Sequence, residues 1–186
     1  MRISKQKAAE NRDRVVASAA RLFRERGFEG VSVAELMASA GLTHGGFYNH
    51  FEAKAEVEAA ALHHVFEASA ARIRAVAAEP DDKIRARALA DYCAAYVSPK
   101  ARDADAAACP MVAFAADVSR QEERVRCVYA DGLRAYLEAF ANAGATQRDQ
   151  AILRFASLVG ALTLARSVAA SDPDLSNEIL SAAQKA

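Results

Sequence analysis

Apolar side chains recur along the chain at intervals of three and four residues, the spacing of one face of an α-helix. The first such stripe, formed by Val15, Ala19 and Leu22, predicts a helix from about residue 7 to residue 26. Gly27 is placed to end this helix, because glycine readily adopts the left-handed conformation of a helix C-cap. A longer apolar pattern over residues 54–78 predicts another helix.

Two short helices are expected between these long ones. Ser32 and Glu35 have the spacing of a capping box, which predicts that a helix begins there. Gly41 would end that helix, and Thr43 is a good N-cap for the next one. Two short helices joined by a tight turn with glycine are typical of a helix-turn-helix.

The remaining apolar patterns are also helical, and no segment alternates in the way a strand requires. Residues 98–108 are small and polar, which favours a loop. The sequence therefore predicts an all-α fold of eight or nine helices. An N-terminal three-helix domain (residues 1–56) would precede a larger C-terminal helical domain (residues 57–186). The further helices are expected at 82–97, 110–119, 122–142, 148–169 and 173–184.

Charge is unevenly distributed in a chain whose formal net charge is zero. Residues 1–26 carry eight basic and three acidic side chains, whereas residues 57–186 carry fifteen basic and seventeen acidic ones. A basic N-terminal segment indicates contact with a polyanion, although the solvated face of a helix would give the same pattern.

The three cysteines, Cys93, Cys109 and Cys127, have neither the number nor the spacing of a disulfide framework or a zinc site. The N-terminus lacks the apolar stretch of a signal peptide. The longest apolar run, residues 155–165, is too short to span a bilayer. We therefore expect a cytoplasmic protein without metal, cofactor or membrane contact.

The segment from residue 42 to residue 54 is the most informative. Gly45 and Gly46 lie in the first turns of a helix, where each costs about 1 kcal/mol relative to alanine. Such a cost is reasonable if the helix must approach another surface closely, and a DNA groove is one such surface. Phe47 and Phe51 are four residues apart and can anchor the helix, which leaves polar side chains free for phosphates and base edges. A Gly-Gly loop followed by an aromatic core strip is the alternative.

Residues 11–56 resemble the DNA-binding domain of the TetR family. The matching phrases are Leu22-Phe23-Arg24-Glu25-Arg26-Gly27-Phe28, Val31-Ser32-Val33, and Leu36, Ala40-Gly41-Leu42-Thr43, Gly45, Tyr48, His50-Phe51 and Lys54. The resemblance implies a homodimeric repressor that binds double-stranded operator DNA and is released when an unidentified small molecule binds its C-terminal domain.

The resemblance also implies individual DNA contacts. The positions expected at phosphates are Tyr48, His50 and Lys54, and those expected to face the major groove are Thr43, His44, Gly46 and Asn49. Val33 lies where the second helix presents its N-terminus to the DNA backbone, a place suited to an anion. Two positions depart from the family pattern. Gly46 stands where many members have a hydroxylated residue, and Ala53 replaces the usual polar cap before the next helix.

The last two helices are similar to the family's dimerisation pair. One stripe comprises Ile152, Phe155, Val159, Leu162 and Thr163, with the small residues Ala156 and Gly160, and the other comprises Leu175, Ile179 and Ala183. Two subunits would then form a four-helix interface. The alternative is that these stripes belong to the core of a single chain.

The central helices are expected to enclose the effector pocket, because they carry apolar and aromatic residues. The candidate lining is Cys93, Tyr96, Cys109, Phe114, Tyr129, Leu133 and Tyr136. Cys109 precedes Pro110 at a helix N-terminus, where the helix dipole is expected to lower the thiol pKa. This opens an alternative, a redox- or electrophile-sensing repressor with Cys93 or Cys127 as resolving partner. A buried structural thiol is a further interpretation.

An enzyme is not expected. His63 and His64 are adjacent, so they point about 100° apart on a helix and do not form a chelating pair. The sequence has no Ser-His-Asp phrase, glycine-rich phosphate loop or acidic metal cluster. A helical interaction module without operator affinity is a third possibility.

Overall fold

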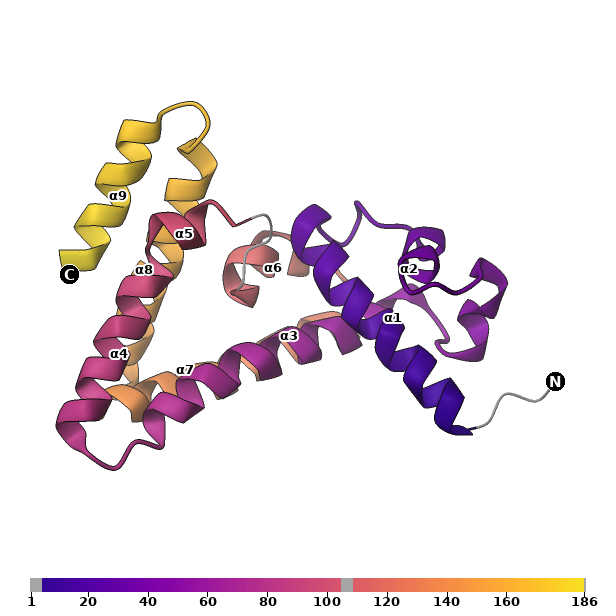
Figure 1. Ribbon diagram of the computed structural model, residues 1–186, viewed down its shortest axis with the longest axis horizontal. Coiled ribbons are helices and arrows are strands. Elements are labelled where there is room, and N and C mark those ends of the chain that lie inside the picture. The colour runs from indigo at the N-terminus through magenta and orange to yellow at the C-terminus, as the bar shows by residue number, and fades with distance from the viewer. Residues whose placement is uncertain (1–4, 105–108, 186) are drawn as a thin grey trace.

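The computed structural model describes residues 5–104 and 109–185, and these residues form helices without any strand (Figure 1). The all-α expectation is confirmed. The elements are α1 (Lys5–Arg26), α2 (Val33–Ser39), the 3₁₀ helix η1 (His44–Asn49), α3 (Lys54–Ala77), α4 (Asp82–Tyr96), α5 (Pro99–Arg102), α6 (Pro110–Val118), α7 (Glu123–Gly144), α8 (Arg148–Val168) and α9 (Pro173–Lys185).

Local sequence signals determine the helix ends in the N-terminal domain. The capping box is present, since the Ser32 hydroxyl accepts from the Glu35 backbone N–H and the Glu35 carboxylate accepts from the Ser32 N–H at 2.8 Å. These bonds and the Arg26 guanidinium lower the pKa of Glu35 to about 2. Gly27 and Gly41 have φ values of 71° and 67°, the left-handed conformation that ends α1 and α2.

The third element of the helix-turn-helix differs from the expected α-helix. Residues His44–Asn49 form a 3₁₀ helix, and Thr43 at its N-cap makes no side-chain capping bond. A 3₁₀ turn is the tighter relative of the α-helix and is used in short segments. The two successive glycines are poor α-helix formers, which is consistent with this outcome.

Helix α3 belongs to both halves of the molecule. It packs against α1 at one end and lies along α7 over most of its length, with α1 and α2 at one end of this pair and α4, α8 and α9 at the other (Figure 1). The helices approach closely at Gly132, where an added Cβ would lie 2.4 Å from the ring of Phe66. The expected domain boundary at residues 56 and 57 therefore falls within the first turn of α3.

The C-terminal half is built around an aromatic cluster. The ring of Phe155 on α8 packs against Tyr136 and Phe140 of α7, with centroids 4.8 and 5.3 Å apart. Helix α9 packs on α8, where the buried Ser176 hydroxyl donates to the Ala165 carbonyl at 2.8 Å. The segment expected to be a loop at residues 98–108 contains the short helix α5, capped by Ser98. The rest of that segment, from residue 105, lies outside the described residues.

Helix α8 is apolar on two sides. Phe155 and Leu162 are buried in the chain, whereas Leu153 and Leu164 are 69% and 58% exposed. By length and composition it is the one helix of the described residues apolar enough to cross a membrane, yet only 28% of that apolar window is buried. The predicted stripe is therefore divided between the core and an exposed apolar face that includes Ile152, with the half-buried Gly160 at its edge.

Candidate nucleic-acid interface and effector cavity

The helix-turn-helix exposes the polar side chains that the sequence singled out. Phe47 and Phe51 are buried, with ring centroids 5.6 Å apart, and they fix η1 to the domain core. Tyr48 is 75% exposed, and its ring meets Phe47 edge-on at 5.3 Å. Thr43, His44 and Asn49 are also exposed. These groups lie together on η1 or at its start, so one surface carries a phenol, an amide, an imidazole and a hydroxyl.

Gly45 and Gly46 are not required by the packing of the domain. A Cβ added at Gly45 would meet no atom within 4 Å, and one at Gly46 would meet Met37 and Thr43 at the ordinary contact distance of 3.7 Å. The interior therefore has room for larger residues at both positions. The expectation that these glycines allow another surface to come close stays a prediction.

Two other predicted contact positions are partly covered. Val33, the first residue of α2, is half-buried and packs against the core. His50 is half-buried too, and its backbone carbonyl accepts a hydrogen bond from Arg12. Their roles at the DNA backbone are untested by this geometry and stay predictions.

Lys54 has partners inside the chain that the sequence did not reveal. Its Nζ donates to the Phe28 carbonyl oxygen at 2.7 Å and lies 3.4 Å from a carboxylate oxygen of the buried Glu58. Burial raises the pKa of Glu58, and the Lys54 charge opposes that rise. The ammonium thus ties the start of α3 to the end of α1, and a phosphate would have to share it with these groups.

Much of the basic N-terminal charge is compensated within the domain. Arg12 pairs with Glu56 at 2.8 Å and stacks over Phe51, and Arg26 pairs with Glu35 at 2.6 Å. Arg21 likewise pairs with a neighbouring carboxylate. The charge pattern by itself therefore overstates how many cations are free for a polyanion.

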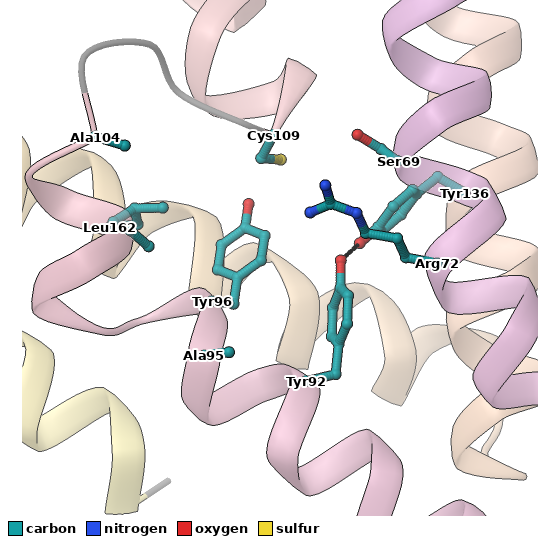
Figure 2. Close-up of a pocket in the computed structure, with 10 residues that line it drawn as sticks. Ser69, Arg72, Tyr92, Ala95, Tyr96, Ala104, Cys109, Tyr136 and Leu162 are labelled. Atoms are coloured by element: carbon teal, nitrogen blue, oxygen red, sulfur yellow. Dashed lines mark hydrogen bonds between the residues drawn. The ribbon is translucent and has the colours of Figure 1, made fainter.

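A cavity of 210 Å³ opens among α3, α4, α7, α8 and the segment that follows α4. Three tyrosines, one arginine and one cysteine give it polar character. Its lining is Ser69, Arg72, Tyr92, Ala95, Tyr96, Ala101, Ala104, Cys109, Tyr136 and Leu162 (Figure 2). The hydroxyl groups of Tyr92 and Tyr136 are hydrogen-bonded to each other. Tyr96 Oη is buried and, within the described residues, interacts only with the Cys109 thiol.

The structure brings together three of the seven expected pocket residues, namely Tyr96, Cys109 and Tyr136. Cys93 lines a neighbouring cavity of 390 Å³ between α4, α8 and α9. The other three pack elsewhere. Phe114 stacks on Phe28 with centroids 5.0 Å apart, Tyr129 meets Phe66 edge-on at 5.4 Å, and Leu133 packs against the core.

Arg72, Ser69 and Tyr92 were not anticipated as cavity residues. Ser69 and Arg72 are three residues apart on α3, and Tyr92 precedes Tyr96 by four residues on α4. Residues at these spacings share one face of a helix. The spacing was thus a usable signal, although it does not reveal which neighbouring helix the face meets.

The expectation for the Cys109 pKa is wrong. Burial raises the pKa of this thiol and outweighs the Tyr96 hydroxyl and the backbone N–H groups of Val112 and Met111, which lower it. Cys93 and Cys109 are buried and Cys127 is exposed, and all three are free thiols. Among the described residues, no group of three metal-ligating side chains is arranged to hold an ion.

Helix α6 contacts both the cavity and the N-terminal domain. Its N-cap, Cys109, lines the cavity, and Phe114 stacks on Phe28 just beyond α1. A Cβ at Gly27 would lie 2.8 Å from a carboxylate oxygen of Asp117, so this contact is close. Helix α6 therefore contacts both the lining of the cavity and the end of α1.

Comparisons with known proteins agree with this architecture. Residues 15–67 match the family model described as bacterial regulatory proteins of the tetR family. The reduced form of Escherichia coli NemR aligns with a TM-score of 0.76 at 21% identity, covering 95% of this chain and 97% of that one. A TetR-family regulator from Cytophaga hutchinsonii aligns with a TM-score of 0.74 at 19% identity, covering 100% of this chain and 96% of that one.

A more distant structure, RolR in complex with resorcinol, aligns with a TM-score of 0.53 at 22% identity, covering 98% of this chain and 89% of that one. No curated protein matches the sequence.

Proposed function

Since the chain belongs to the TetR family of bacterial transcriptional regulators, we propose that it is a homodimeric repressor that leaves its operator when a small molecule fills the 210 Å³ cavity. The observation that carries the DNA-binding part is the exposed polar surface of η1, held in place by the buried Phe47 and Phe51. Such a surface, presented on a helix-turn-helix, fits the major groove. The proposal describes a soluble regulator with no catalytic role.

In this proposal η1 lies at the major groove. Tyr48 and His50 hold phosphates, with Lys54 as a further phosphate contact, while Asn49 and His44 reach base edges. Thr43 and Gly46 face the same groove, and Val33 brings the N-terminus of α2 to the backbone. The 75% exposure of Tyr48 supports its role, because its hydroxyl group is then accessible to a phosphate oxygen.

The proposed dimer interface is the exposed apolar face of α8 together with α9. Leu153 and Leu164 are exposed in the single chain, as is Leu175 on α9. A second copy of α8 and α9 would bury these side chains in a four-helix arrangement. This accounts for a helix that is apolar on both sides in a protein that binds DNA.

Release would proceed through α6. A molecule in the cavity contacts Cys109 at the start of this helix, and the middle of α6 packs on Phe28 of the DNA-binding domain. If the occupied cavity favours another position of α6, the two domains change their relative orientation. By thermodynamic linkage, the factor by which a ligand weakens operator binding equals the factor by which operator weakens ligand binding.

The test is binding of the purified full-length protein to DNA from around its own gene, followed by selection of binding sites from random sequence. We expect an inverted repeat whose half-sites lie about one helical turn apart. The affinity should fall steeply with salt, by about 0.9 log units per neutralised phosphate for each log unit of salt. Failure to select any sequence would contradict the proposal.

Thiol-based release is the second candidate, because Cys109 lines the same cavity. An electrophile that enters would meet its sulfur directly. The raised pKa of Cys109 makes the thiolate scarce, and thiolate is the reactive form. Non-covalent occupation of the cavity is therefore the favoured route.

A further inference from the structure

We propose that the molecule that fills this cavity is a small organic carboxylate, whose charged end pairs with Arg72 and accepts hydrogen bonds from the tyrosine hydroxyls. The inference deepens the proposed function and rests on it. Three features of the cavity carry it: one cation that forms no ion pair among the described residues, several hydroxyl donors, and a small apolar remainder.

Arg72 is the cation of the cavity. Figure 2 shows its side chain leaving α3 and extending toward the space bounded by Tyr92, Tyr96 and Cys109. Within residues 5–104 and 109–185, Arg72 forms no ion pair, whereas Arg74 on the same helix is paired with Glu67 at 2.9 Å. The guanidinium has a flat array of donors that matches the two oxygens of a carboxylate.

The positive charge of Arg72 changes the pKa values of neighbouring groups. It lowers the pKa of Tyr92 against the larger effect of burial, and it also lowers the pKa of Arg24 on α1, where burial is again the larger cause. An anion beside Arg72 would relieve the repulsion between the two arginines. Because Arg24 lies on α1, the charge of the ligand would also change the electrostatic potential in the DNA-binding domain.

The tyrosines supply donors. Tyr96 Oη is buried, and among the described residues only the Cys109 thiol, a weak hydrogen-bonding group, interacts with it. A stronger acceptor in the cavity would satisfy this hydroxyl better. In the Tyr92–Tyr136 pair one hydroxyl donates to the other, so the accepting hydroxyl keeps its own proton to donate. Burial raises the pKa of all three phenols, so they stay protonated at neutral pH and act as donors to an anion.

The rest of the cavity selects the size of the ligand. Ala95, Ala101 and Leu162 give it an apolar wall. Its 210 Å³ is below the range of about 300–1,000 Å³ that drug-sized ligands occupy. One arginine balances one negative charge. A monocarboxylic acid with a single ring or a short alkyl chain satisfies these conditions, whereas a doubly charged phosphate would be left half-compensated.

The experiment compares acids with their neutral isosteres on the full-length dimer. Benzoate and hexanoate are titrated against benzamide and hexanamide by calorimetry, with the wild type, Arg72→Gln and Arg74→Gln. Arg74 is the matched control, because it lies on the same helix and outside the cavity lining. We expect at least one acid to bind at least tenfold more tightly than its amide, Arg72→Gln to abolish that preference, and Arg74→Gln to keep it.

Equal affinity for acid and amide in the wild type would overturn the inference, as would no binding by either acid, or an unchanged acid preference in Arg72→Gln. The first two of these outcomes are measured on the wild type alone, so they remain informative even if Arg72→Gln folds poorly. Operator binding by the same preparations separates the two levels. Sequence-selective DNA binding without acid binding would refute the carboxylate ligand and leave the proposed repressor function intact. Absence of both DNA binding and acid binding would refute the proposed function as well.

Discussion

Replacing Gly160 by leucine should separate the proposed dimer without damaging the single chain. A Cβ added at Gly160 meets no atom within 4 Å, so the fold of one subunit has room for a side chain there. The position lies in the middle of α8, on the face with the exposed Ile152 and Leu164. A leucine at this point would project from the chain into the space that the second subunit is proposed to occupy.

The size of the effect follows from two opposing contributions. Within a helix, removing glycine favours folding of the subunit by up to about 1 kcal/mol. Overfilling a packed contact costs about 1–3 kcal/mol, and twofold symmetry repeats the change, so the dimer would lose about 2–6 kcal/mol. Since about 1.4 kcal/mol corresponds to a tenfold change, the dimer dissociation constant should rise by between about thirtyfold and twenty-thousandfold.

Sedimentation velocity over a range of concentrations measures the dissociation constant, and circular dichroism measures the helix content of the same samples. We expect Gly160→Leu to shift toward monomer with unchanged helicity and to bind operator more weakly. Gly160→Ala is the milder control and should dissociate less. A Gly160→Leu protein that dimerises as tightly as the wild type would refute the assignment of this face, and a monomeric wild type at micromolar concentration would refute the dimer itself.

Three further predictions address packing, DNA reading and the thiol. Gly132→Ala should lower the free energy of unfolding, because the added Cβ would lie 2.4 Å from the Phe66 ring. Overpacking costs about 1–3 kcal/mol, which exceeds the gain of about 1 kcal/mol from replacing glycine in a helix. A melting temperature equal to that of the wild type would contradict the close approach of α3 and α7. Tyr48→Phe should weaken specific and non-specific DNA binding together, whereas Asn49→Ala should relax preference at one symmetric pair of operator positions, worth about 1–3 kcal/mol, in a site selection at fixed salt. Cys109→Ser should leave operator affinity unchanged and keep carboxylate-induced release; if electrophiles release the wild type but not this variant, the thiol route is the correct one.

The helix ends of the N-terminal domain were predictable because the causes are local. The Ser32–Glu35 capping box and the glycines at positions 27 and 41 act through bonds within a few residues, and the structure contains all of them as expected. The 3₁₀ form of η1 was not predicted, since the energy difference between a 3₁₀ and an α-helical turn is small and depends on what the segment packs against.

The cavity was only partly predictable, because its membership depends on contacts between segments far apart in the sequence. Tyr96 and Tyr136 were chosen as aromatic residues of central helices, but the same rule chose Phe114, which packs on the DNA-binding domain instead. Arg72 was missed, since a charged residue on a long helix usually faces solvent; Arg72 is indeed exposed, and only the fold shows that it also lines the cavity. The inward bonds of Lys54 also join positions 26 residues apart, which no local pattern reveals.

The continuity of α3 has a mechanical consequence. This single helix of 24 residues begins beneath the DNA-reading segment and carries Arg72 near its far end. At about 1.5 Å of rise per residue, the distance from Arg72 back to the start of the helix is about 27 Å. A tilt of roughly 5° about the cavity end would carry the other end through about 2 Å, which exceeds the tolerance of a hydrogen bond to a base. If η1 reads the major groove as proposed, the length of α3 would convert a small rotation around a bound molecule into a misalignment with the DNA.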